Sequence, residues 1–187
     1  MRIHLIAAAL ALVASVAMAE TTIPAPPDLA ANGKYQSNVV SAVLPAPIDE
    51  AWEFWRNTPI TDFVEPTDRI PAIAGFENLK GDWGEPGSIR RVNFEDGGSA
   101  LERVLTNTDR EFTYQIWNIQ TGSGRFIEHI YGKFVAQPVD SGTQITWSYN
   151  VKPRVFIARP FISSFLRNDF APFMESGMQG MASAHPG

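Results

Sequence analysis

Acid–base chemistry in this chain falls mainly on one histidine and one carboxylate. His129 is the only histidine inside the expected domain, because His4 lies in an apolar leader and His185 lies in the C-terminal tail. A histidine near carboxylates can act as a general base at neutral pH, and Glu102 is the second candidate for proton transfer. The alternative is a structural or surface histidine with satisfied hydrogen bonds. These residue types alone assign no catalytic residue firmly.

Two tyrosines offer hydrogen bonds to a ligand. Tyr114 and Tyr131 each lie in a segment rich in β-branched and aromatic residues. A tyrosine hydroxyl in an apolar pocket can orient a ligand hydroxyl or carbonyl group. The same side chain also packs in ordinary cores with only its tip hydrogen-bonded, so the sequence allows both roles.

Composition excludes several classes of function. The 187 residues are 44% hydrophobic and 19% charged, which suits one globular domain. The absence of cysteine excludes disulfides, a thiolate nucleophile and Cys-ligated zinc. There is no G-x-S-x-G elbow, P-loop or G-x-G-x-x-G motif, and we expect no metal and no cofactor. A net charge of −5 without a Lys/Arg block argues against nucleic acid or an anionic membrane as a partner.

The N-terminus has the pattern of a secretory signal peptide. Arg2 precedes an apolar run over Leu5–Val16, and Ala17-Met18-Ala19 places small residues at positions −3 and −1 of a cleavage site. The run is shorter than the roughly 20 residues of a membrane span, and a buried N-terminal helix is the alternative. We expect residues 1–19 to be the signal peptide and residues 20–35 an extended tether. The mature protein would then be periplasmic or secreted.

Residues 36–187 are expected to form one α+β domain. Alternating β-branched and aromatic residues between turn residues predict one strand, two short helices and then six strands in an antiparallel meander. The first helix covers Pro47–Trp55 and ends at Thr58-Pro59, and Ile60–Val64 adds a turn. The seven expected strands are Gln36–Leu44, Ile73–Gly81, Gly87–Phe94, Ser99–Thr106, Glu111–Ile119, Arg125–Gln137 and Thr143–Lys152.

A long apolar stripe marks the C-terminal segment. Phenylalanine and methionine recur every three to four residues from Phe161 to Met181, which predicts a helix covering the apolar face of the sheet. Charged residues interrupt the stripe, so it is not a membrane span. Pro172 lies in its interior and should kink or split the helix near Arg167–Asp169.

Five local motifs follow one another between Gln36 and Ala184. They are P-ϕ-x-x-ϕ-W at Pro47–Trp55, G-ϕ-x-R within Gly87–Phe94, E-R-ϕ at Glu102–Val104, D-x-x-x-x-Y at Asp109–Tyr114 and G-T-x-ϕ-x-W at Gly142–Trp147. Their succession resembles the SRPBCC superfamily, which includes START domains, polyketide cyclases and pollen-allergen-like proteins. The resemblance implies a helix-grip fold: a seven-stranded antiparallel sheet wrapped around a long C-terminal helix. It also implies a deep cavity that holds an apolar or amphipathic small molecule.

The resemblance and the alternation of side chains along strands together predict the cavity lining. The family pattern favours Arg90 facing inward, and alternation turns Glu102 inward in the next strand. In the strand over Arg125–Gln137 the register is ambiguous. We expect His129 to face inward there, because the alternative register buries Glu128. The expected lining is Arg90, Val92, Phe94, Glu102, Tyr114, His129, Tyr131, Trp147, Tyr149, Phe170, Met174 and Met178.

Two groups in this lining have competing interpretations. Buried together, Arg90 and Glu102 would form an ion pair that either orients a ligand or is purely structural. A register slip of one residue would place both at the surface. Met174 and Met178 either line a surface that adapts to varied ligands or simply pack in the core.

Three functions are compatible with these features. The leading hypothesis is an exported, non-catalytic protein that binds or carries an apolar or lipid-like small molecule. The second is a lyase or isomerase of the cyclase or dehydratase type, which would use His129 and Glu102 for proton transfer. The third is an interaction module whose cavity is closed by its own side chains. The sequence does not indicate an oligomeric state.

Cleavage of the leader is directly testable. The mature protein is expected to begin at Glu20, because Ala19 is the last small residue of the cleavage pattern. N-terminal sequencing of protein recovered from the exported fraction measures this. Recovery of the chain from the cytoplasm with Met1 intact would contradict it.

Overall fold

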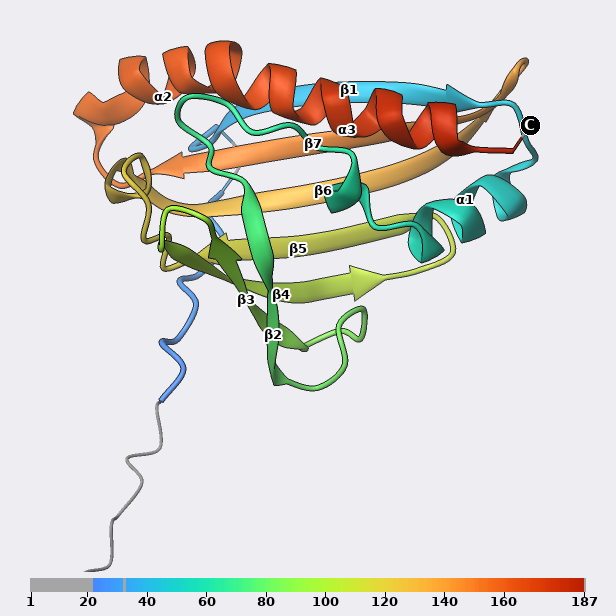
Figure 1. The fold of residues 1–187 in the computed structure, drawn as a ribbon. Coiled ribbons are helices and arrows are strands. Elements are labelled where there is room, and N and C mark those ends of the chain that lie inside the picture. Colours follow the sequence, from blue (N-terminus) through green and yellow to red (C-terminus); the bar gives the residue numbers. More distant parts are fainter. Residues whose placement is uncertain (1–21, 32, 187) are drawn as a thin grey trace, which may run out of the picture.

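The computed structural model describes residues 22–31 and 33–186, in which a curved sheet lies beneath a long C-terminal helix (Figure 1). The expected signal peptide at residues 1–19 lies outside the described residues. The strands are β1 (Gln36–Leu44), β2 (Ile73–Lys80), β3 (Ile89–Phe94), β4 (Ser99–Asn107), β5 (Glu111–Trp117), β6 (Ile127–Val139) and β7 (Gly142–Pro153). Their order across the sheet is β1-β7-β6-β5-β4-β3-β2, with every pair antiparallel. The expected seven-stranded antiparallel sheet is confirmed.

Two short helices connect β1 to β2, as expected. They are α1 (Ile48–Asn57) and a 3₁₀ turn at Ile60–Asp62. The apolar stripe of α1 is buried, and the rings of Trp52 and Trp55 stack 4.7 Å apart. The Trp52 indole N–H also donates to the carbonyl of Thr108 at 2.9 Å, which fastens the helix to the turn between β4 and β5.

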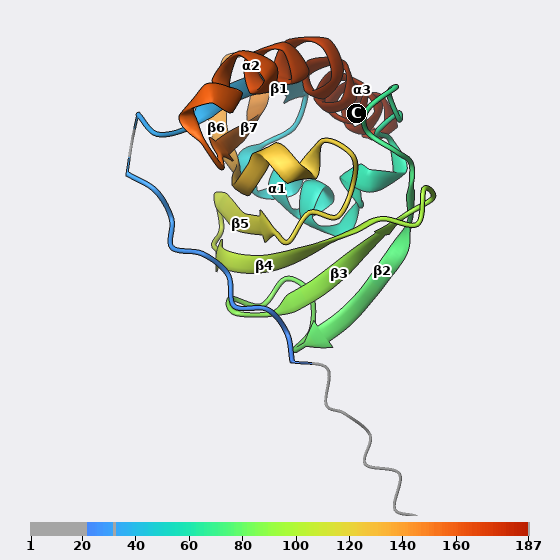
Figure 2. The ribbon, with the colours of Figure 1, turned by 90° about the vertical axis from the view of Figure 1, so that its left-hand side faces the viewer.

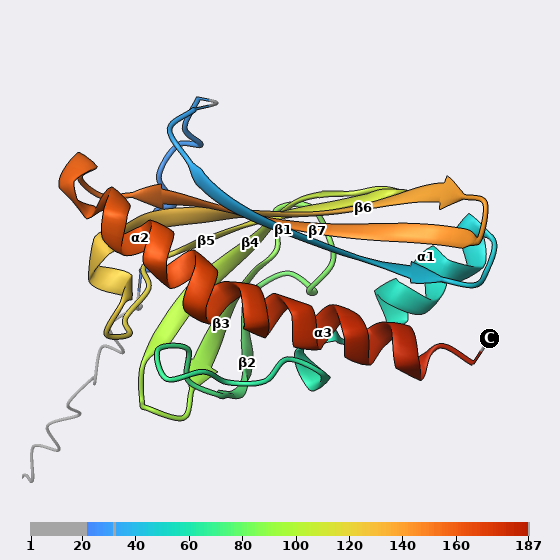
Figure 3. The ribbon, with the colours of Figure 1, turned by 90° about the horizontal axis from the view of Figure 1, so that it is seen from above.

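The C-terminal helix runs continuously from α2 (Arg159–Phe165) through a π-helical turn at Leu166–Phe170 to α3 (Ala171–Ala184) (Figure 3). The π turn ends two residues before Pro172, which has no N–H to donate and disfavours a regular α-helical turn. Within it, the N–H of Ala171 donates to the carbonyl five residues earlier. The expected disturbance is therefore a widened turn. Among the described residues, no helix has both the length and the apolar character needed to span a membrane.

Different parts of the chain cover the two faces of the sheet. The C-terminal helix crosses the inner face, whereas residues 24–31 and 33–35, the N-terminal strap, run along the outer face (Figure 2). The Trp117 indole N–H donates to the carbonyl of Pro24 at 3.0 Å, and the Gln115 amide donates to that of Pro27 at 2.9 Å. The expected tether is therefore extended and packed against the domain.

The register of β6 corrects one prediction. A bulge between Ile127 and His129 offsets the alternation, so Ile127 faces inward while His129 and Tyr131 face outward. The expectation was that this register would bury Glu128. Its side chain instead stays one-third exposed and pairs with Lys152 at 3.3 Å. The prediction that His129 and Tyr131 line the cavity is wrong, because a bulge allows inward residues three positions apart.

Gly132 makes room for an aromatic ring on the inner face. It pairs directly with Tyr114 of β5, and a Cβ atom at Gly132 would overlap the Tyr114 ring. The absence of a side chain therefore lets the ring lie across β6. There it comes within 6.2 Å of the Phe134 ring and 6.1 Å of the Tyr149 ring.

Substituting Gly132 tests this packing. Gly132→Ala is expected to lower the free energy of unfolding by about 1–3 kcal/mol, because the ring and the strand must separate. Gly122→Ala is the matched control, since its Cβ would meet nothing within 4 Å. Urea unfolding followed by circular dichroism measures both. Equal stability of the two variants would contradict the proposed overlap.

Candidate functional site

Two adjoining cavities lie between the inner face of the sheet and the C-terminal helix. The larger has a volume of about 360 Å³ and the smaller about 100 Å³. They share a wall made of Ile73, Val92, Glu102, Tyr149 and Phe173. The side chains of this domain therefore do not fill the space under the helix.

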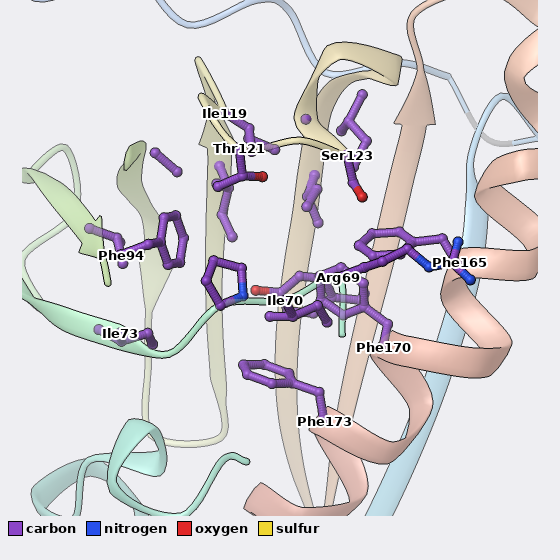
Figure 4. Close-up of a pocket in the computed structure, with 18 of the residues that line it drawn as sticks. Arg69, Ile70, Ile73, Phe94, Ile119, Thr121, Ser123, Phe165, Phe170 and Phe173 are labelled. Atoms are coloured by element: carbon purple, nitrogen blue, oxygen red, sulfur yellow. The ribbon is translucent and has the colours of Figure 1, made fainter. Parts of the chain in front are cut away.

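The smaller cavity is almost entirely apolar. Figure 4 shows Phe165, Phe170 and Phe173 from the helix segment converging on a space that Ile70, Phe94 and Ile119 approach from the other sides. The loop carrying Ile70 is held by an ion pair between Arg69 and the buried Asp169 of the π turn, at 3.1 Å. The π turn thus positions both the aromatic wall and the loop that covers it.

The larger cavity has an aromatic wall and a polar corner. Its wall consists of Trp55, Phe76, Trp83, Phe112, Tyr114, Phe134, Trp147, Tyr149 and Phe173. Several of these rings contact one another; for example, Phe134 lies 4.4 Å from Trp55 and 4.9 Å from Trp147. Rings fixed by neighbouring rings give a preformed apolar surface for a ligand.

The polar corner is the ion pair of Arg90 and Glu102. Both Nε and Nη2 of Arg90 donate to Oε2 of Glu102 at 2.7 Å, and both side chains are largely buried. The guanidinium is held between two rings, at 3.9 Å from the Phe76 centroid and 3.7 Å from that of Trp83. Both ionic contacts use Oε2, and within the described part of the chain no side chain donates to Oε1. That oxygen is an available acceptor in a cavity wall.

A second polar group lies in the wall of the larger cavity. The Trp147 indole N–H donates to the hydroxyl of Tyr114 at 3.0 Å. Burial raises the pKa of Tyr114 well above its usual value, with smaller contributions from Tyr149 and Glu102. Burial likewise raises the pKa of Tyr149, and Glu102 adds to the effect. Both phenols are therefore protonated, neutral groups at physiological pH.

The structure brings together eight of the twelve expected lining residues. Arg90, Val92, Phe94, Glu102, Tyr114, Trp147, Tyr149 and Phe170 line one or both cavities. The two methionines do not: Met174 and Met178 are buried in the core, and Met174 Sδ accepts a hydrogen bond from Asn38 of β1. The helix faces the cavities with phenylalanines, because its methionine side packs onto β1.

His129 belongs to the outer face and to the N-terminal strap. It is fully buried, its Nε2 lies 3.0 Å from the Tyr35 hydroxyl, and its Nδ1 lies 3.5 Å from the Glu128 carboxylate. Burial lowers the pKa of His129, which favours the neutral imidazole at physiological pH. The interpretation of a structural histidine fits this placement, and the two cavities lack an imidazole in their described lining.

Sequence reasoning missed the two aromatic partners of Arg90. Phe76 lies in β2, where a register shift between Ile73 and Gly75 interrupts the alternation of side chains. The regular strand pattern therefore does not predict that Phe76 faces Arg90. Trp83 lies in a Gly-rich loop, where neither helical nor strand periodicity predicts which way a side chain faces. The one usable signal was a lone tryptophan in a polar loop, which is rarely left exposed.

Comparison with known proteins identifies the architecture. No family model and no curated protein matches the sequence. Among solved structures, ginseng major latex-like protein 151 from Panax ginseng superposes with a TM-score of 0.59, at 14% identity over 82% of this chain and 99% of that protein. The chain has the helix-grip fold.

Other structures with this helix-grip fold superpose similarly. The Zhui aromatase/cyclase from Streptomyces sp. R1128 has a TM-score of 0.56, at 14% identity over 79% of this chain and 93% of that protein. Ara h 8.0201 has a TM-score of 0.52, at 18% identity over 80% of this chain and 99% of that protein. The helix-grip fold that the motifs implied is thus confirmed.

Alkaline titration tests the buried tyrosines. Because the pKa values of Tyr114 and Tyr149 are raised above those of the unfolded chain, the unfolded state loses these protons first. The contribution of these two tyrosines to the free energy of unfolding should therefore be constant below about pH 10 and fall above it. Tyr149→Phe should make that fall shallower, as measured by urea unfolding from pH 8 to 11. Tyrosinate absorbance rising fully while the chain stays folded would contradict this.

Proposed function

We propose that this protein binds, and carries, an apolar small molecule with one hydrogen-bonding end. The observation that carries the proposal is the larger cavity, whose volume of about 360 Å³ lies within the usual range for small-molecule sites. Its aromatic wall supplies apolar contact, and its single ion pair supplies orientation. The third hypothesis, a module closed by its own side chains, is not supported by an interior of this size.

The polar corner indicates the chemistry of the ligand's polar end. Arg90 is already engaged by Glu102 and two rings, so it is poorly placed to neutralise a ligand anion. The free Oε1 of Glu102 accepts hydrogen bonds, and neutral tyrosine hydroxyls can donate or accept them. A neutral ligand with a hydroxyl or similar donor therefore fits better than a carboxylate or phosphate.

Acid–base catalysis has weaker support from the geometry. The histidine that would have been the base lies on the outer face, hydrogen-bonded to Tyr35. Glu102 is the one carboxylate in the described lining, and it is held by Arg90. His129→Ala should therefore spare both ligand affinity and any turnover, whereas a cyclase-like mechanism through His129 would lose turnover by about 10²–10⁴-fold at nearly unchanged affinity.

Export is part of the same proposal. The support is the signal-peptide pattern at the N-terminus, followed by a strap that packs onto the folded domain. A carrier that works outside the cytoplasm would begin at Glu20 and keep the strap. Native mass spectrometry of protein purified from the exported fraction would identify a bound molecule by its mass.

Filling the cavity tests the binding site. Val92→Phe places a ring at the shared wall of both cavities and should weaken binding of the apolar fluorophore N-phenyl-1-naphthylamine at least about tenfold. Val39→Phe is the matched control, because Val39 is 58% exposed on β1. Fluorescence titration gives both dissociation constants. Unchanged binding by a folded Val92→Phe protein would refute this site.

A further inference from the structure

Three large apolar side chains stand exposed at one end of the molecule. Val155, Phe156 and Ile157, the apolar tip, follow β7 and lead into α2, with exposures of 52%, 80% and 86%. Single exposed apolar residues are ordinary on protein surfaces, but three consecutive large ones at a protruding turn are not. Within the described residues they add little to the core, so they are free to contact another surface.

Arginines surround the apolar tip. Arg154 precedes it, Arg159 lies with its guanidinium 5.2 Å from the Phe156 ring, and Arg125 belongs to the adjacent turn. That turn is joined to the tip by hydrogen bonds from Arg154 to the carbonyls of Phe126 and Ile127. Among the described residues, no carboxylate lies within 4 Å of these three arginines.

The surrounding charges leave this end cationic. Glu128 is the neighbouring carboxylate on β6, and it is paired with Lys152 at 3.3 Å. Asp169 on the helix is paired with Arg69 at 3.1 Å. Three arginines without a carboxylate partner thus gather at this end of a chain whose net charge is −5. The sequence did not reveal this cluster, because Arg125 comes from a segment far from Arg154 and Arg159.

The apolar tip adjoins the smaller cavity. The 3₁₀ turn Gly124–Phe126 and its N-cap Ser123 connect the two: Ser123 and Gly124 line the cavity, while the Phe126 carbonyl accepts a hydrogen bond from the N–H of Arg154 beside the tip. The Arg125 guanidinium lies 4.7 Å from the Phe126 ring centroid. Phe126 also packs 4.5 Å from Phe161 at the start of the helix. A surface bound at the tip would therefore lie beside the apolar interior.

We propose that the apolar tip docks this protein onto the surface of an anionic phospholipid bilayer. Phe156 and Ile157 would enter the headgroup region, and Arg125, Arg154 and Arg159 would contact lipid phosphates. This interaction goes beyond ligand binding in the cavity and does not depend on it. It also replaces the expectation, drawn from net charge alone, that an anionic membrane is not a partner.

The chemistry of the tip favours a lipid surface over a second copy of the chain. A stable protein interface buries about 800 Å² on each partner, which three side chains on a turn do not provide. Shallow insertion into a bilayer needs only a few apolar side chains beside cationic ones. The acidic charge of the rest of the molecule orients this end toward an anionic surface and disfavours any other end.

A local fluorescent label tests the docking in the full chain. Because the chain has no cysteine, Ile157→Cys gives a single site for a polarity-sensitive nitrobenzoxadiazole label. Val139→Cys is the matched control, since Val139 is also exposed but is the last residue of β6, where it pairs with Gly142 at the start of β7. It therefore lies at the opposite end of these strands from the tip. We expect a blue shift at position 157 with vesicles of phosphatidylcholine and phosphatidylglycerol, little with phosphatidylcholine alone, and none at position 139.

Charge variants of the labelled chain separate attraction from insertion. Arg154→Gln and Arg125→Gln should each weaken the apparent vesicle affinity about fivefold at low salt. Lys80→Gln, on the far edge strand β2, should not change it. Raising the salt concentration should weaken binding of the unsubstituted labelled chain.

Each contrary outcome overturns the proposal. An unchanged label at position 157, or an equal response at position 139, would show that the tip does not insert. A blue shift that depends on protein concentration without vesicles would identify a second copy as the occupant. Failure here leaves fluorophore binding in the cavity unaffected, so it is distinguishable from failure of the proposed function.

Discussion

One helix cannot cover the whole inner face of a seven-stranded curved sheet, and the other features of the interior follow from that limit. Within the C-terminal helix, α3 packs most closely on β1, where its methionines are buried. The inner faces of β3 to β6 are consequently covered only in part, by α1 over β6 and by the loop before β2. Aromatic side chains, a loop and the ion pair of Arg90 with Glu102 border this space, and cavities remain between them. The fold therefore creates its binding space through incomplete coverage.

Much of this architecture could be predicted from the sequence, because its local signals agree with one another. The strands follow from alternation and turn residues, and the helix follows from its apolar stripe. The position of the helical irregularity follows from Pro172, since backbone chemistry does not depend on tertiary contacts. Inward residues were correct wherever a strand alternates without interruption, as for Trp147 and Tyr149 in β7.

The errors occurred where tertiary structure overrides local pattern. The bulge after Ile127 reverses the facing of His129, and no propensity in the sequence marks it. The argument that the other register of β6 would bury Glu128 failed, because Glu128 stays partly exposed and pairs with Lys152. The aromatic contacts of Arg90 join β2, β3 and a loop, so they arise only when the sheet assembles. Periodicity can assign a face to a residue but not the neighbours that it meets there.

The N-terminal strap has a consequence for the order of folding. Its hydrogen bonds join pairs of residues that are far apart in the sequence: Pro27 and Gln115 are separated by 88 positions, and Pro24 and Trp117 by 93. These bonds close very long loops, so they depend on a sheet that is already formed. Before the strap docks, the outer face lacks this cover. Trp117 and Gln115 then lack the acceptors that the strap supplies, and the surface around His129 is open to water. Docking of the strap therefore follows formation of the sheet.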